Sequence, residues 1–364
     1  MKIKVKKEAM LASLQKVQSV INPRNTLAVL ANVLFRAQDG KLELTATDMA
    51  LTLRTTMEAE VLQPGSTTIP AKRILGVFRE LAVAEVELEV NDQNITLIHA
   101  GSSHFKIHGI SENEYPNLPE LADAKTYTLD QGDFKNMLKL TSFAASLDTN
   151  RQLLNGVLLS FKNGKLSVVA TDSRRLAHVE QEVEFPADAA LDLIVPLKTV
   201  DELLKTLGDS GPLKIMATPK QVGFDFNSVF IVSKLEEGKY PNYQQVIPQT
   251  SNQRIDLERE VFLSAIRRTS QLVIDVVSGV KLTFSKNQLE ILAQAPEVGE
   301  ARETMAVKYK GPEISISFNP HFLMDPLKVL TDDEVQLHLT DDTSPGVIRS
   351  TVNFIYVLMP IRSS

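Results

Sequence analysis

A proline-led segment recurs three times along this chain of 364 residues. Pro70, Pro196 and Pro320 each end or follow a short apolar run and precede a stretch in which apolar residues recur with a helical period. The nitrogen of a residue in the first helical turn has no partner within the helix, so proline is tolerated there. The pattern therefore predicts a helix at each proline. In the second copy the apolar stripe consists of Leu197, Val200, Leu203, Leu204 and Leu207.

The three prolines are separated by 126 and 124 residues, and two other markers keep this interval. Asp48 in TATD and Asp172 in VATD are 124 residues apart. Tyr115 and Tyr240, each followed by Pro-Asn, are 125 residues apart. Three unrelated markers at one interval predict three copies of one domain of roughly 120 residues, which is an ordinary single-domain length.

Each copy follows one order of elements: a short strand, an amphipathic helix, alternating strands, the proline-led helix and further strands. DG and NG dipeptides between alternating runs indicate hairpins. We therefore expect an α+β fold in which each domain packs two helices on one face of an antiparallel sheet. The expected domains span residues 1–120, 127–245 and 253–364, with proline-rich linkers at 116–126 and 241–253.

Composition excludes several classes of protein. The chain has no cysteine, which excludes disulfides, thiolate metal sites and cysteine nucleophiles, and a cytoplasmic location is expected. It has no apolar run of about 18 residues, so no membrane span is expected. The basic start MKIKVKKEAM is not followed by an apolar segment and predicts a strand rather than a secretory signal. The net charge of −6 argues against tight nucleic-acid binding over the whole surface but allows one basic face.

Lysine and arginine residues gather opposite the apolar stripes of the expected helices. They recur in all three copies, as in Lys72, Lys198 and Lys328 of the proline-led helices. For any one helix, a solvated polar face is the simpler interpretation. Their recurrence on helices that the repeat would bring to a common surface favours a basic binding face.

The sequence contains no recognisable motif of catalytic residues. Phosphate-binding loops, dinucleotide-binding glycine motifs, and zinc-protease and serine-hydrolase signatures are all missing. His104 and His108 share a face of one expected strand, but no carboxylate or cysteine accompanies them, so no metal or cofactor is expected. Asp48 and Asp172 end strands, where aspartate commonly shapes a turn, and we interpret both as structural. We expect a protein that is not an enzyme.

Three stretches carry a resemblance to a known family. ATDSRRL, SKLEEGKYPNY and the C-terminal YVLMPIR resemble the β sliding clamps, the processivity subunits of bacterial DNA polymerase III. The likeness runs through essentially the whole chain in the same three-repeat order. It implies a head-to-tail homodimeric ring of six domains that encircles double-stranded DNA without sequence preference. It also implies a pocket between the second and third domains that receives short peptide motifs of the replicative polymerase, the clamp loader and repair or translesion polymerases.

Helix packing supports the implied ring of two chains. Twelve helices spaced about 8–10 Å apart form a circle of axes roughly 30–38 Å across. Subtracting a helix width of about 10 Å leaves about 20–28 Å, comparable to the width of a DNA duplex. Six helices from one chain would leave almost no opening. An acidic body, with −6 on each chain, and a basic lining would touch phosphates weakly, which permits sliding.

The resemblance assigns candidate residues to three sites. Those expected to contact DNA are Arg24, Arg73, Arg151 and Lys198. Those expected to form the peptide pocket are Leu154, Thr171, Arg175, Leu176, Pro241, Val246, Asn319, Phe322, Val357, Leu358, Met359, Pro360, Ile361 and Arg362. Those expected at the dimer interface are Phe105, Ile107 and Leu272. The DTNRQLL loop, the rim residues Ser173 and Arg174, and Gln271 stand where relatives often differ, so a distinctive rim and interface are expected.

Pro326 conflicts with the local helical pattern. It lies inside the third proline-led helix, where proline costs about 3 kcal/mol and usually kinks or ends the helix. A bend or a break is therefore expected after Met324.

Two other classes of function remain open. The first is a repeat-domain scaffold that binds peptides but never DNA, which would keep every activity after its helix lysines and arginines were neutralised. The second is an enzyme with a site between domains, against which the missing motifs argue.

Overall fold

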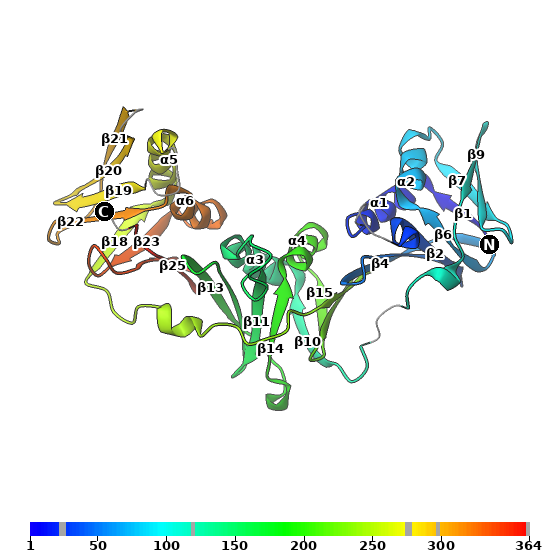
Figure 1. Cartoon of the computed structure of the whole chain (residues 1–364), viewed down its shortest axis with the longest axis horizontal. Coiled ribbons are helices and arrows are strands. Elements are labelled where there is room, and N and C mark those ends of the chain that lie inside the picture. Colours follow the sequence, from blue (N-terminus) through cyan, green and yellow to red (C-terminus); the bar gives the residue numbers. More distant parts are fainter. Residues whose placement is uncertain (22–26, 118–120, 274–278, 296–298, 362–364) are drawn as a thin grey trace. The chain divides into compact units, whose positions relative to one another are not determined.

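The computed structural model describes residues 1–21, 27–117, 121–273, 279–295 and 299–361 (Figure 1). The chain divides into two compact units. Unit 1 comprises residues 1–135 and 201–235, and unit 2 comprises residues 136–200 and 236–364. Each unit combines antiparallel sheets with helices packed on them, as expected for an α+β fold.

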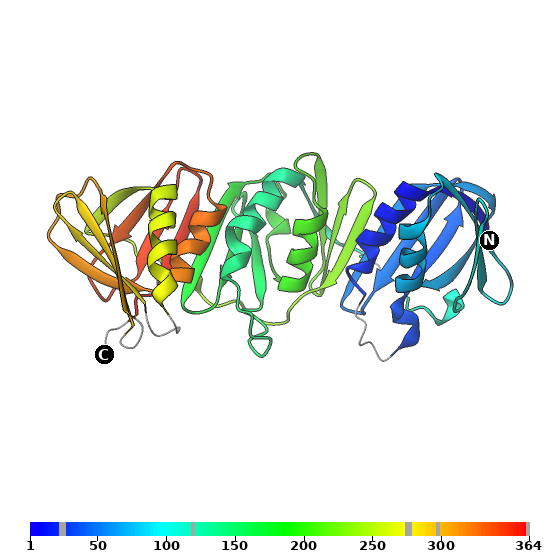
Figure 2. The ribbon, with the colours of Figure 1, turned by 90° about the horizontal axis from the view of Figure 1, so that it is seen from above.

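The described residues of unit 1 form two antiparallel sheets. The helices are α1 (Lys7–Gln18) and α2 (Ala71–Glu80), which lie side by side, with α1 against β3 and β4 (Figure 2). The strands are β1 (Lys2–Lys6), β2 (Asn32–Gln38), β3 (Lys41–Thr47), β4 (Leu51–Glu58), β5 (Glu60–Gln63), β6 (Gly65–Pro70), β7 (Glu85–Val90), β8 (Ile95–Ala100), β9 (Ser103–His108), β10 (Lys125–Asp130), β15 (Pro212–Ala217), β16 (Gln221–Phe226) and β17 (Val229–Lys234). Their orders are β5-β1-β7-β8-β9 and β10-β15-β16-β17-β4-β3-β2-β6.

Unit 2 also has two antiparallel sheets in its described residues. Helices α5 (Arg259–Thr269) and α6 (Pro320–Val329) lie side by side, while α3 (Gln131–Thr141) and α4 (Leu197–Thr206) each include residues of both units. The strands are β11 (Gly156–Lys162), β12 (Lys165–Thr171), β13 (Arg175–Glu182), β14 (Leu191–Pro196), β18 (Gln253–Glu258), β19 (Val280–Ser285), β20 (Gln288–Ala295), β21 (Gly299–Ala306), β22 (Ile314–Phe318), β23 (Glu334–Leu339), β24 (Gly346–Arg349) and β25 (Phe354–Leu358). Their orders are β14-β11-β12-β13-β25-β24-β23-β18 and β21-β20-β19-β22.

The apolar stripes predicted from the sequence form the buried sides of the helices. In α1, Met10, Leu14 and Val17 are buried, and in α2, Ile74 and Phe78 are buried. Burying one such side chain stabilises a fold by about 1.5–3 kcal/mol. Isolated helices of 12 and 10 residues, the lengths of α1 and α2, are marginal in water. Packing on the sheet therefore stabilises these helices more than their intrinsic propensity does.

The proline-led helices begin at the proline or one residue later. Pro320 is the first residue of α6, as predicted. Pro70 and Pro196 instead close strands β6 and β14, and helices α2 and α4 begin at the next residue. Proline keeps its carbonyl as an acceptor, so it can close a strand while its fixed φ leads into the following helix.

The two repeated aspartates shape the same turn in both units. Asp48 Oδ1 accepts hydrogen bonds from the second and third following backbone nitrogens at 3.0 and 2.8 Å. Asp172 Oδ1 accepts from the equivalent nitrogens at 2.9 and 3.0 Å. A carboxylate that accepts from nearby backbone N–H groups fixes a tight turn. The prediction that both aspartates shape turns is confirmed.

The strand after each aspartate turn pairs with a strand of the next repeat. Thr55 of β4 lies opposite Val229 of β17 in unit 1, and Val179 of β13 lies opposite Phe354 of β25 in unit 2. The positions of the second pair are 124 and 125 residues beyond those of the first, so the repeat interval recurs in the register. One sheet continues from each repeat into the next, which the sequence repeat alone does not predict.

Helix α6 runs from Pro320 to Val329 without interruption, so the expected break after Met324 does not occur. Pro326 has no N–H, and the carbonyl of Phe322, four residues earlier, therefore lacks its helical donor. The hydroxyl of Tyr356, a fully buried residue of β25, donates to this carbonyl at 2.8 Å. The bond satisfies a carbonyl that proline leaves without a partner.

Substitution of Tyr356 tests this arrangement. Tyr356→Phe should lower the free energy of unfolding by about 1–3 kcal/mol, because the Phe322 carbonyl loses its donor. Pro326→Ala restores the helical N–H, so the tyrosine substitution should cost less in that background. Chemical denaturation of the wild type, the two single variants and the double variant measures the difference. Equal costs in both backgrounds would contradict this account.

His178 of β13 is packed against apolar groups without a polar partner. It lies opposite Val169 on one neighbouring strand and Ile355 on the other, and the ring of Tyr243 is 5.5 Å from its own. Neither ring nitrogen has a hydrogen-bond partner among the described residues. Burial lowers the pKa of His178, and the carboxylate of Glu180 opposes this shift only in part. Folding therefore disfavours the charged form of His178.

The pH dependence of unfolding follows from this shift. The folded protein holds the pKa of His178 below its value in the unfolded chain, which is about 6.5. Between these two values the unfolded chain binds more protons, so stability should fall as the pH is lowered below about 6.5. His178→Phe should make thermal unfolding less sensitive to pH there. The pH dependence that remains in this variant includes a contribution from His338. Burial lowers the pKa of His338 as well.

The exposed His321 provides the matched control, because its side chain meets solvent in both states. His321→Phe should keep the wild-type slope. An unchanged slope in His178→Phe would show that His178 does not contribute.

Candidate functional site

A cavity of about 220 Å³ lies in unit 2. It forms where the aspartate turn before β13, the loop after Tyr240 and the end of β25 come together. Among the described residues that line it there is no aspartate or glutamate, and most are apolar. The lining residues are Leu154, Thr171, Ser173, Arg174, Arg175, Leu176, Pro241, Asn242, Tyr243, Val246, Val357 and Met359.

Strand pairing creates the buried side of the cavity. Leu176 of β13 lies opposite Val357 of β25, and both side chains are buried. They belong to an apolar cluster that includes Leu158, Ile194 and Tyr240. The register of a strand pair decides which side chains share a face. The pairing of β13 with β25 therefore brings the C-terminal VLM segment to the aspartate turn of the second repeat.

The rim carries exposed apolar side chains. Met359 is 45% exposed and Val246 is 50% exposed. The backbone nitrogen of Met359 donates to the carbonyl of Arg174 at 2.9 Å, which holds the residue after β25 against the turn. Exposed apolar residues beside an apolar cavity are typical of a surface that binds another apolar group.

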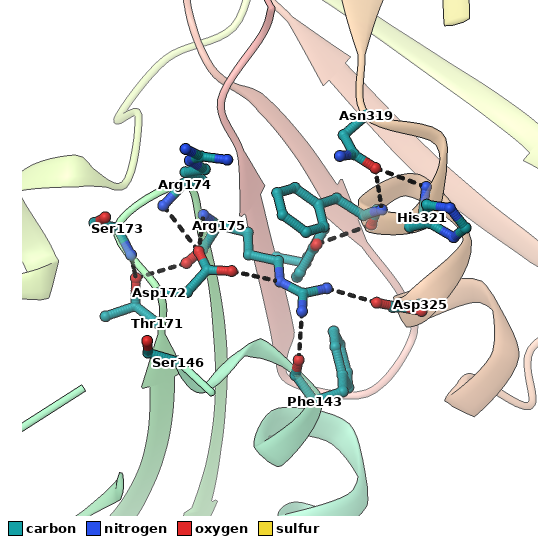
Figure 3. A network of polar contacts seen from close by, with 12 residues as sticks. Phe143, Ser146, Thr171, Asp172, Ser173, Arg174, Arg175, Asn319, His321 and Asp325 are labelled. Atoms are coloured by element: carbon teal, nitrogen blue, oxygen red, sulfur yellow. Dashed lines mark hydrogen bonds and ion pairs between the residues drawn. The ribbon is translucent and has the colours of Figure 1, made fainter. Parts of the chain in front are cut away.

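Arg175 connects the aspartate turn to α6 (Figure 3). Its Nε donates to Asp172 Oδ2 at 3.1 Å, its Nη1 donates to Asp325 Oδ2 at 2.6 Å, and its Nη2 donates to the carbonyl of Phe143 at 2.6 Å. The guanidinium carbon lies 4.3 Å from the centroid of the Phe322 ring. The side chain is only 10% exposed, so two carboxylates and a ring face balance its charge instead of water.

The cavity brings together eight of the residues predicted for the peptide pocket. These are Leu154, Thr171, Arg175, Leu176, Pro241, Val246, Val357 and Met359.

Five other predicted pocket residues do not line the cavity. Asn319 caps α6, where its Oδ1 accepts from the backbone nitrogens of residues 321 and 322 at 2.9 and 3.4 Å. Phe322 lies under the Arg175 guanidinium. Leu358 is buried, and Pro360 and Ile361 follow β25, with the Ile361 nitrogen donating to the carbonyl of residue 317 at 2.8 Å. Arg362 lies outside the described residues.

Sequence reasoning missed Asn242 and Tyr243, which directly follow the predicted Pro241. Tyr243 begins the 3-10 turn Tyr243–Val246, and burial raises the pKa of its hydroxyl. An aromatic residue in a linker rich in proline and polar residues was the available signal, because aromatic side chains are rarely left in water without a packing partner.

The described candidates for the DNA contacts and for the dimer interface are exposed or half-buried on the elements that carry them. Arg73 of α2 is exposed and lines a groove of about 760 Å³ together with Phe105 and Ile107 of β9. Lys198, the second residue of α4, is also exposed. Leu272 ends the 3-10 turn Ser270–Leu272 and is half-buried.

Arg151 lies close to the cavity rim. Its Nη1 donates to Ser173 Oγ at 3.2 Å, and its Nε is 3.7 Å from Asp148 Oδ2. Arg24 lies outside the described residues.

The described ranges contain neither a cluster of metal-ligating side chains nor a membrane-spanning helix. No group of three or more histidines, aspartates and glutamates there could hold a metal ion. In β9, His104 instead meets His99 across the strand pair, with the two Nδ1 atoms 2.9 Å apart. None of the helices in this part of the chain is both long and apolar enough to cross a membrane.

Three family models match the chain in order. They are the N-terminal domain of the DNA polymerase III beta subunit over residues 1–119, the central domain over residues 128–242 and the C-terminal domain over residues 244–362. The beta sliding clamp of Bacillus subtilis is 30% identical over 377 residues, covering 100% of both chains. The beta sliding clamp of Chlamydia trachomatis is 34% identical over 349 residues, covering 96% of this chain and 84% of the relative.

Solved structures agree with these matches. The crystal structure of the Bacillus subtilis DNA polymerase sliding clamp has a TM-score of 0.95 at 30% identity and covers 100% of both chains. A sliding clamp from Pseudomonas aeruginosa bound to griselimycin has a TM-score of 0.96 at 31% identity, with the same coverage. Three clamp domains in order, full-length relatives and a matching fold show that this chain belongs to the DNA polymerase III beta subunit family, the non-catalytic beta sliding clamps of bacteria.

Proposed function

We propose that two copies of this sliding clamp close head to tail into a ring around duplex DNA. In this proposal the cavity beside Met359 holds short peptide motifs of the replicative polymerase, the clamp loader and repair or translesion polymerases. The observation that carries the peptide site is the apolar cavity with exposed apolar side chains on its rim and no lining carboxylate among the described residues.

The size of the cavity favours a peptide over a small metabolite. Sites for drug-sized ligands are about 300–1,000 Å³. A cavity of about 220 Å³ is smaller and suits one or two side chains of an extended segment. Apolar anchors of short linear peptides dock in such pockets, and a flexible methionine on the rim adapts to different anchors.

The proposed DNA contacts are Arg24, Arg73, Arg151 and Lys198. Arg73 and Lys198 support the proposal because both are exposed in the first turn of a proline-led helix. The amino-terminal end of a helix carries partial positive charge, which favours phosphate. A chain with a net charge of −6 and a limited number of such contacts would hold DNA weakly and without sequence preference.

The remaining parts of the proposal concern assembly. We propose Phe105, Ile107 and Leu272 for the contact between the two copies, since Phe105 is an exposed aromatic residue beside a groove. We retain the domain bounds 1–120, 127–245 and 253–364, and a cytoplasmic location.

A single charge in the cavity tests the peptide site. Met359→Asp should weaken binding of a polymerase-derived peptide at least tenfold, because a carboxylate cannot be buried against an apolar anchor without a large desolvation cost. Fluorescence anisotropy of the labelled peptide measures the affinity, and circular dichroism checks the fold.

Val352→Asp is the matched control, because Val352 is 42% exposed in unit 2 and does not line the cavity. It should bind the peptide as the wild type does. Wild-type affinity in a folded Met359→Asp variant would remove the assignment of the site.

A further inference from the structure

Among the described residues, Arg174 has no partner for its charge, unlike Arg175, the other cation that lines the cavity. Arg175, its neighbour, is paired with Asp172 and Asp325 at 3.1 and 2.6 Å. Arg174 uses its backbone nitrogen and carbonyl within the turn, but its guanidinium makes no hydrogen bond or ion pair with any described residue. Figure 3 shows the two side chains pointing in different directions, with Arg175 toward Asp325 and Arg174 away from it.

The backbone of Arg174 is held beside the apolar rim. Asp172 Oδ1 accepts from the Arg174 backbone nitrogen at 2.9 Å, and the Arg174 carbonyl accepts from the Met359 nitrogen at 2.9 Å. Ser173, the preceding residue, has a φ of 77°, in the left-handed region. The held backbone keeps the base of the Arg174 side chain beside the rim, while the side chain itself is exposed to solvent.

Two carboxylates of the polar cluster around the aspartate turn are already paired with Arg175 and make no ion pair with the guanidinium of Arg174. Asp172 and Asp325 are both engaged by Arg175, and their side chains are only 17% and 25% exposed. The described residues that line the cavity include no acid. In the part of the chain that the structure describes, the entrance of the apolar cavity thus presents an exposed guanidinium, that of Arg174, without a paired carboxylate.

We propose that Arg174 selects partner peptides that carry an aspartate or glutamate within about two residues of the side chain anchored at Met359. This rests on the proposed function of the cavity as a peptide site. Guanidinium and carboxylate groups form paired hydrogen bonds of matching geometry, and the interaction fixes the register of the peptide as well as its charge.

The effect is moderate because the pair lies at the rim. An exposed ion pair changes affinity about two- to fivefold. Salt screens such a pair, so the preference should shrink as ionic strength rises. The apolar anchor supplies most of the affinity. Arg174 determines which of the peptides that share this anchor bind more tightly.

Selection from a random heptapeptide phage library tests the proposal with no assumed partner sequence. The wild type should enrich peptides with an acidic residue at one fixed distance from an apolar residue. Arg174→Glu should enrich lysine or arginine at that distance. Lys239→Glu is the matched control, since Lys239 is exposed, makes no ion pair among the described residues and does not line the cavity. It should select as the wild type does.

A double-mutant cycle then measures the pair directly. One enriched peptide is compared with its derivative in which the acid is replaced by lysine, on the wild type and on Arg174→Glu. The acidic peptide should bind the wild type about two- to fivefold more tightly, and the order should reverse on the variant. The same peptide preference on both proteins would overturn the role of Arg174.

Met359→Asp separates the two proposals. If it enriches the same peptides as the wild type, or if the wild type enriches none, then the cavity is not the peptide site and both proposals fail. If Met359→Asp enriches none while the wild type and Arg174→Glu enrich identical peptides, the peptide site stands and only the role of Arg174 is lost.

Discussion

The cavity in unit 2 depends on the pairing of β13 with β25. This ladder places Leu176 opposite Val357 and brings Met359 within hydrogen-bond distance of Arg174. A slip of one residue would turn Val357 to the other face of the sheet and remove the buried side of the cavity. The same register holds β4 against β17 in unit 1. The strand pairing between successive repeats therefore recurs in both units, but the side chains on it differ. Thr52 stands in the first repeat at the position that Leu176 occupies in the second.

A polar cluster around Arg175 stabilises the pairing of β13 with β25 and links both strands to α6. Arg175 joins the aspartate turn to α6, and Tyr356 supplies the donor that Pro326 cannot. Removing one partner from a half-buried ion pair leaves the other uncompensated, which costs more than the pair contributes. The cluster therefore favours one arrangement of turn, strand and helix. Because Arg175 is saturated by this structural role, the charge available to a partner at the rim is that of Arg174.

Local sequence patterns predicted the helices and turns well. Contacts between residues far apart in the sequence were not predicted. The stripes Met10–Val17 and Ile74–Phe78 are buried as their period indicated, and Asp48 and Asp172 shape turns. Sheets shared by two repeats were not predictable, because backbone ladders between distant strands leave no periodic signal. The predicted break at Pro326 was wrong for the same reason. Tyr356, thirty positions away, donates to the Phe322 carbonyl that Pro326 leaves without a helical donor. Asn319 and Phe322, which the resemblance predicts for the pocket, do not line the cavity: Asn319 caps α6, and the Phe322 ring lies under the guanidinium of Arg175.

Retention on DNA tests most directly whether this clamp encircles its template. The protein is loaded onto nicked circular plasmid by a clamp loader, free protein is removed by gel filtration, and the circle is then cut once. A closed ring predicts stable retention on the circle and rapid loss after linearisation, because weak phosphate contacts alone cannot hold it. Equal retention on circular and linear DNA would contradict the ring and indicate ordinary surface binding. Absence of retention, with a loader shown to be active on another clamp, would favour a peptide-binding scaffold.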